Sequence, residues 1–225
     1  MNLHDESDKR DKVFEAWFKN YYLHLILGIL FIFINLSFLA PVLLKTGLTY
    51  PAKLIYWVDG FFCHQLPFRS WFFFGYQPFY PLASTGMKNM ISFEEYFRPT
   101  TMDFRTSRLI MGNSSAGFKM AICQRDIAMY LSLWGFGLIF ALKNRKIKKL
   151  PIWIWFLFGV IPLGLDGGLQ ILGNLNAPTL KIFAYESTPL LRTITGSLFG
   201  LFTGWYVFPA LDSVINKNPS LMLEI

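Results

Sequence analysis

The chain has 225 residues, of which 53% are hydrophobic and 16% are charged, and its mean hydropathy is +0.38. The apolar residues come in long uninterrupted blocks, which excludes an ordinary soluble domain built from amphipathic helices. The net charge of +7 is concentrated beside these blocks, so it indicates membrane topology and attraction to anionic lipid; no nucleic-acid-binding motif accompanies it, and we expect no nucleic-acid partner.

Residues 1–20 are expected to form a cytoplasmic tail followed by an interfacial half-helix. Met1 to Lys12 are charged and lack an apolar pattern, which predicts a disordered tail. Val13 to Lys19 carries Phe14, Trp17 and Phe18 on one side, and this pattern is typical of a short helix that lies in the membrane interface.

Residues 21–225 are predicted to form a single helical membrane domain. A helix needs roughly 20 apolar residues to cross the hydrocarbon core of a bilayer. Four stretches meet that length: 21–44, 122–142, 150–172 and 191–211. Basic residues precede the first stretch and fill the connection between the second and third. The positive-inside bias therefore predicts a multi-pass protein of the cell (plasma or inner) membrane with both termini in the cytoplasm.

The connection 45–121 is then external and divides into two parts. Pro51 to Phe74 is apolar and aromatic, but polar residues such as Asp59 interrupt it too often for a lipid-exposed span. It is expected to lie against the bundle as an amphipathic or re-entrant helix. From Tyr76 to Lys119, proline and glycine mixed with charges indicate an irregular cap that roofs the external face. The predicted fold class is thus an all-α membrane protein with four transmembrane helices, this helical segment and an external cap.

The outer half of the third stretch contains Pro162, Gly164, Gly167 and Gly168. Proline removes a backbone donor, so one interpretation is a kinked or broken helix beside a cavity. The other is a set of small residues for tight helix packing.

Nearly all the residues capable of chemistry are expected at the external ends of the spans or in the segment before the cap. An ionisable side chain costs about 2.5–3.5 kcal/mol at the centre of a membrane helix and less near the interface. The residues at this depth are Cys63, His64, Gln65, Arg69, Ser70, Cys123, Arg125, Asp126, Asp166, Gln170, Glu186, Ser187 and Arg192. We predict that they share one site at the extracytoplasmic face.

The residue types suggest roles within this site. Arginines supply fixed positive charge for an anionic group such as a lipid phosphate or carboxylate. The expected substrate-binding residues are Gln65, Arg69, Ser70, Arg125, Gln170, Ser187 and Arg192, and the acid/base candidates are His64, Asp126, Asp166 and Glu186. The plausible ion pairs join Arg125 or Arg192 to Asp166 or Glu186. The competing interpretation is an ion-pair network that only fixes helix packing.

The two cysteines allow three interpretations. Cys63 and Cys123 could form a disulfide in an oxidising compartment. They could instead bind zinc or copper together with His64, with Asp126, Asp166 or Glu186 as a further ligand. They could also be free and buried. The chain has no paired-cysteine spacing that would decide between these.

Several short motifs occur in order along the chain. They are Cys63-His64-Gln65, Arg69-Ser70, Cys123-x-Arg125-Asp126, Asp166-Gly167 with Gln170, Glu186-Ser187, Arg192 and Thr195-Gly196. In this combination the chain resembles a family of small predicted membrane proteins of bacteria and archaea, catalogued as domain of unknown function 2085. The resemblance covers Phe61 to Gly204 and implies no established activity. The stretch from Gly75 to Cys123 is longer than in that pattern.

Three functional hypotheses follow. The first is an enzyme that acts on an anionic lipid or lipid-linked substrate. The second is a transporter, or a subunit that binds an ion or solute; four spans offer little room for a path and no internal repeat is visible, although an oligomer would provide one. The third is a structural or assembly protein of the membrane.

Overall fold

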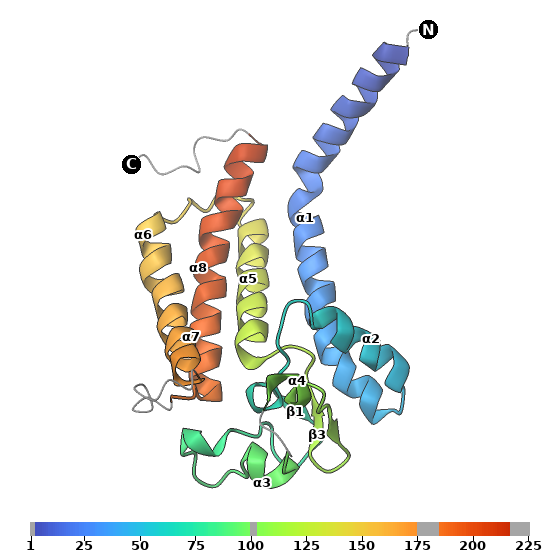
Figure 1. Cartoon of the computed structure of the whole chain (residues 1–225). Helices are drawn as coiled ribbons and strands as arrows, with labels where there is room; N and C mark the ends of the chain where they lie inside the picture. Colours follow the sequence, from blue (N-terminus) through green and yellow to red (C-terminus); the bar gives the residue numbers. More distant parts are fainter. Residues whose placement is uncertain (1–2, 100–102, 175–184, 217–225) are drawn as a thin grey trace.

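The computed structural model describes residues 3–99, 103–174 and 185–216. Four of its helices are long and apolar enough to cross a membrane, and a small cap with three short strands lies at one end of them (Figure 1). The predicted fold class, an all-α membrane protein, is confirmed.

The first crossing belongs to one long helix, α1 (Leu3–Lys45). The predicted disordered tail is wrong for residues 3–12, which are helical. No proline or glycine precedes Gly28, and the charged residues there are mostly good helix formers, so the helix of the span extends through them. Lys19 and Glu15, one helical turn apart, form an ion pair with 2.5 Å between Nζ and Oε1. This pair adds to the stability of the helix. Phe14 and Trp17 lie exposed on this part of α1.

Helix α2 (Thr49–Asp59) folds back along α1. Its buried side places Ile55 and Tyr56 against Ala40 of α1, while Trp57 is exposed on the other side. The helix ends where the carbonyl of Asp59 accepts hydrogen bonds of 3.0 Å from the amides of the two residues at 62 and 63. The amphipathic helix predicted for 51–74 is therefore confirmed only up to residue 59.

The other crossings are α5 (Gln124–Leu142), a composite helix, and α8 (Pro189–Ile215). The composite helix consists of α6 (Ile152–Trp155), the π-helical turn η3 (Phe156–Val160) and α7 (Ile161–Asn174).

The π-helical turn ends two residues before Pro162, which has no N–H to donate to the preceding turn. The kink or break predicted from Pro162 thus corresponds to a π-helical turn in the structure. A Cβ added to Gly164 or Gly168 would meet nothing within 4 Å, so tight packing does not explain these two glycines.

Helices α5 and α8 form the most extensive contact between helices in the described chain. Gly196, Gly200 and Gly204 are spaced four apart on α8 and face α5. A Cβ at Gly200 would lie 2.0 Å from the carbonyl oxygen of Met129, and one at Gly196 would lie 2.3 Å from that of Arg125. This stripe of small residues lets the two backbones approach closely, as in other membrane helix pairs.

The sequence has two basic clusters, one in the N-terminal part of α1 and one in the connection between α5 and α6. Both of these segments lie at the end of the bundle opposite the cap (Figure 1). Arg145, from the connection between α5 and α6, donates hydrogen bonds of 3.1 and 2.6 Å to the carbonyls of Lys19 and Asn20 on α1. It also lies 3.6 Å from the carboxylate of Asp212, near the end of α8. The two basic flanks are therefore on one side of the bundle.

The cap between α2 and α5 is a small packed unit. Its elements are η1 (Pro67–Arg69), β1 (Phe72–Phe73), η2 (Ala83–Thr85), α3 (Phe93–Phe97), α4 (Phe104–Ser107), β2 (Gly112–Asn113) and β3 (Gly117–Lys119). The strands form an antiparallel sheet in the order β1-β3-β2, in which Phe72 pairs with Lys119. Leu66, Phe68, Phe72, Tyr80, Phe93 and Ala116 make a core of its own. This core anchors residues 63–70 next to the membrane helices.

Candidate functional site

The first buried ion pair joins Arg125, in the first turn of α5, to Asp166 of α7. Gln170, one turn further along α7, accepts a hydrogen bond of 3.4 Å from the same guanidinium. The hydroxyls of Tyr185 and Thr195 donate to Asp166 at 2.8 and 3.3 Å. Because Gly167 carries no side chain, the guanidinium fits against α7, where an added Cβ would lie 3.4 Å from it.

The second ion pair centres on Glu186, which is 8% exposed. Arg69 donates to its two carboxylate oxygens through Nε and Nη2 at 3.1 and 3.2 Å. Arg192, only 2% exposed, forms an ion pair with the same carboxylate. Gln170 donates to it at 2.5 Å and so connects the two ion pairs. The structure thus contains two of the pairings expected from sequence, Arg125 with Asp166 and Arg192 with Glu186.

Buried amide groups complete this network. Arg192 donates to the side-chain oxygen of Gln124 at 3.1 Å and to the carbonyl of Phe68 at 3.3 Å. Gln124 donates in turn to the carbonyl of Ser70 at 3.2 Å. Ser187 is buried next to Glu186. Gln124 was not among the residues predicted from the sequence, although a carboxamide in the first position of a membrane helix is a recognisable signal.

A pocket of about 130 Å³ lies beside this network. Its walls are Cys63, His64, Gln65, Leu66, Arg69, Cys123, Arg125, Asp126 and Arg192. These residues come from the segment after α2, the start of α5 and the start of α8. The described part of residues 76–119 contributes no residue to these walls. Its aromatic core packs against Leu66 and Phe68, next to the pocket. The structure brings most of the residues predicted to share a site together in this pocket and in the ion-pair network beside it.

Two thiols and a carboxylate meet in the pocket. The sulfurs of Cys63 and Cys123 and one oxygen of Asp126 all lie within 4.8 Å of one another. Both cysteines are free in the structure. Hydrogen bonding to Cys123 and burial raise the pKa of the Cys63 thiol well above its ordinary value. His64 lines the same pocket, but it is exposed and its ring nitrogens are not part of this cluster.

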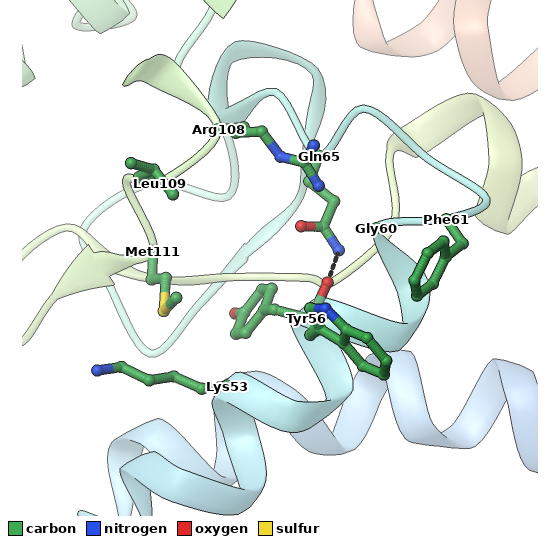
Figure 2. Close-up of a pocket in the computed structure, with 9 residues that line it drawn as sticks. Lys53, Tyr56, Gly60, Phe61, Gln65, Arg108, Leu109 and Met111 are labelled. Carbon is green, nitrogen blue, oxygen red and sulfur yellow. Dashed lines mark hydrogen bonds between the residues drawn. The ribbon is translucent and has the colours of Figure 1, made fainter. Parts of the chain in front are cut away.

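A larger cavity of about 900 Å³ lies between α2 and the cap (Figure 2). Tyr56, Trp57 and Phe61 give it an aromatic wall, and Lys53 and Arg108 bring positive charge to it. Figure 2 shows the Gln65 side chain donating to the carbonyl of Tyr56, at a distance of 2.6 Å. Gln65 is the residue that lines both this cavity and the small pocket.

Lys119 of β3 is fully buried next to the larger cavity. Its ammonium group donates to the carbonyls of Gln65 and Arg108 at 2.7 and 2.6 Å. Burial lowers the pKa of Lys119 to about 7. The first of these hydrogen bonds holds the backbone of Gln65, which has a φ of 55°. Lys119 was not among the residues predicted from the sequence, because a lysine in a loop-rich external segment is normally solvated.

Two comparisons with known proteins match the chain. The model of the family described as "Predicted membrane protein (DUF2085)" matches residues 113–206, and this confirms the resemblance inferred from the motifs. An uncharacterized protein of Methanocaldococcus jannaschii is 24% identical over 206 residues, which cover 89% of this chain and 98% of that protein. No solved structure matches the chain. Together with the four apolar helices, these matches describe a multi-pass membrane protein and assign no activity.

Proposed function

We propose that the protein binds an anionic group of a lipid or lipid-linked substrate in the small pocket and acts on it there. One observation carries this proposal: three arginines, Arg69, Arg125 and Arg192, reach a single pocket from three separate parts of the chain. Guanidinium groups recognise phosphate and carboxylate through several parallel hydrogen bonds. A cluster of them at the end of a membrane bundle fits the charged headgroup of an amphiphile.

The arginines keep hydrogen-bonding capacity for such a ligand. Their ion pairs with Asp166 and Glu186 fix the positions of the guanidinium groups and offset the cost of burying them. The buried Nε atoms of Arg125 and Arg192 nevertheless have no hydrogen-bond partner in the described chain. Each guanidinium group has five N–H donors, so some donors remain for a ligand after the ion pairs have formed.

The candidates for acid/base roles are the pocket side chains that the ion pairs do not engage. Asp166 and Glu186, two of the sequence-predicted catalytic candidates, are engaged by arginines and are better suited to orient them. Asp126 faces the pocket and has no ion pair in the described chain, and His64 lies at the exposed edge. Asp126 is therefore our candidate general acid or base, with His64 as its partner.

The charge distribution supports an extracytoplasmic site. Both basic clusters lie at the end of the bundle away from the pocket. Applied to this arrangement, the positive-inside bias assigns the termini to the cytoplasm of a cell-membrane protein and the pocket to the outer face. A substrate would then come from the outer leaflet. The larger cavity, which shares Gln65 with the small pocket, would accommodate the part of the substrate beyond its headgroup.

Binding of a soluble short-chain phosphatidate tests the proposal. Purified protein in a zwitterionic detergent is titrated with dihexanoyl phosphatidate and, separately, with dihexanoyl phosphatidylcholine. We expect saturable binding of phosphatidate only, and weaker binding by Arg69→Gln, because Arg69, like Arg125, is a partly exposed arginine of the pocket.

Arg105→Gln is the matched control, since Arg105 is an exposed arginine of the cap that lines neither cavity. Equal phosphatidate affinity in the wild type, Arg69→Gln and Arg105→Gln would refute the proposed pocket.

A further inference from the structure

We infer that Cys63, Cys123 and Asp126 form a binding site for one thiophilic divalent metal ion of the zinc type. A tetrahedral zinc ion binds sulfur at about 2.3 Å and carboxylate oxygen at about 2.0–2.2 Å, so its ligand atoms lie roughly 3.3–3.8 Å from each other. The three side-chain atoms already lie within 4.8 Å of one another. Small side-chain rotations would bring them onto a common ion.

Two backbone amides donate to the sulfur of Cys63 and orient it. Its sulfur accepts hydrogen bonds from the amides of Cys123 and Gln65 at 3.2 and 3.4 Å. N–H donors of this kind stabilise the negatively charged sulfur that binds a metal and orient it, as outer-sphere groups do in known metal sites. These two hydrogen bonds would hold the sulfur in place as a ligand.

The second thiol and the carboxylate lie at the positive end of a long helix. Cys123 is the N-cap residue of α5, and its side chain makes no capping hydrogen bond. Asp126 follows three positions later, in the first turn of this 19-residue helix. The helix dipole and the unpaired N–H groups of this turn favour negative side chains. The Cys123-x-Arg125-Asp126 motif therefore supplies two anionic ligands from one helix terminus.

The charges of the pocket also permit a cation. The three arginines Arg69, Arg125 and Arg192 are matched by the three carboxylates of Asp126, Asp166 and Glu186 when both thiols are protonated. Binding of one divalent ion with release of two thiol protons, 2 R–SH + M²⁺ → M(S–R)₂ + 2 H⁺, leaves that balance unchanged. The arginines thus do not exclude the ion.

The ligand set differs from the one expected from sequence. His64 is exposed and its ring nitrogens lie outside the cluster, whereas Asp126 lies within it. Three protein ligands leave a fourth position of a tetrahedral ion open, which is the arrangement of catalytic rather than structural zinc. The pocket beside the cluster has room for water at that position. The metal site does not depend on the proposed headgroup binding. If both proposals hold, the ion and the arginines face the same ligand, and Asp126 serves as a metal ligand in place of the acid or base role given to it without metal.

Cobalt titration tests the inference, since thiolate bound to Co²⁺ gives intense charge-transfer absorption. Reduced, metal-free protein is titrated with Co²⁺ and then with Zn²⁺, and bound metal is measured by elemental analysis after desalting. We expect one ion per chain, a sulfur-to-cobalt absorption band that Zn²⁺ abolishes, and release of two protons. Cys63→Ser, Cys123→Ser and Asp126→Asn should each weaken binding by at least about tenfold.

Two controls keep the test decisive. Asp103→Asn replaces an exposed aspartate of the cap, and His64→Ala removes the nearby imidazole; both should bind metal like the wild type. If a cysteine variant misfolds, the wild type alone still decides, because Zn²⁺ should protect both thiols from alkylation. Unprotected thiols, a stable Cys63–Cys123 disulfide in the purified protein, or equal metal binding by Asp126→Asn and Asp103→Asn would overturn the inference. Phosphatidate binding by the metal-free protein reports on the proposed function separately.

Discussion

Replacement of Glu186 by glutamine should destabilise the protein strongly while changing its shape little. The carboxylate accepts hydrogen bonds from Arg69, Arg192 and Gln170, and Arg192 is only 2% exposed. Without the negative charge of Glu186, the positive charge of Arg192 would remain buried with no opposite charge to compensate it. Loss of one partner of a buried ion pair costs about 3–5 kcal/mol, and we expect a decrease of this size in the free energy of unfolding.

Equilibrium unfolding in mixed micelles, followed by far-ultraviolet circular dichroism, measures this effect. Glu15→Gln is the matched control, because Glu15 forms an i,i+4 pair with Lys19 on α1 and its side chain is 61% exposed. Such a pair contributes only about 0.3–0.5 kcal/mol. A double variant, Glu186→Gln with Arg192→Met, should lose less than the sum of its single changes. Equal stability of Glu186→Gln and Glu15→Gln would refute the reasoning, since it would mean that the Glu186 network is solvated.

Three further predictions concern the lysine of the cap, the glycine stripe and the end of the bundle with the basic clusters. Burial lowers the pKa of Lys119 to about 7, so above pH 7 the unfolded chain binds a proton that the folded chain has lost. The wild type should therefore gain stability between pH 7 and pH 10 relative to Lys119→Met, as measured by unfolding at each pH. Gly200→Ala should destabilise the protein or separate α5 from α8, because its Cβ would lie 2.0 Å from a backbone oxygen, whereas Gly164→Ala should be neutral or stabilise by up to about 1 kcal/mol; thermal unfolding of the pair shows the difference. Tyr22→Phe removes a buried hydrogen bond of 2.5 Å to Asp212 and should cost about 1.5–3 kcal/mol in the same unfolding assay.

Hydropathy was sufficient to predict the membrane helices, because the requirement to cross a bilayer is a property of each segment alone. The charge pattern also placed Arg125, Asp166, Glu186 and Arg192 at similar depths, and the structure pairs them. Ion pairs are predictable in this setting because an isolated charge in a membrane helix is costly, so each charge must find a partner nearby.

The features that the sequence did not predict depend on contacts between distant segments. The helical state of residues 3–12 follows from continuity with the span, which a composition argument ignores. The aromatic core of the cap depends on which residues of 66–116 meet, and no short-range period reports this. The burial of Lys119 depends on carbonyls that come from Gln65 and Arg108. The glycine stripe at 196, 200 and 204 was visible as a small-residue repeat and could have predicted the α5–α8 contact.

The proposed pocket requires that Cys63 and Cys123, 60 positions apart in the sequence, meet beside the arginines. Phenylarsine oxide tests this meeting directly, because its arsenic binds two sulfurs only when both can reach it, with loss of one water. Reduced protein treated with one equivalent of phenylarsine oxide should lose both titratable thiols together. Its mass should increase by that of one phenylarsenic group, which is held by one As–S bond to each cysteine. Two thiols that remain titratable, or that react independently of one another, would contradict the account.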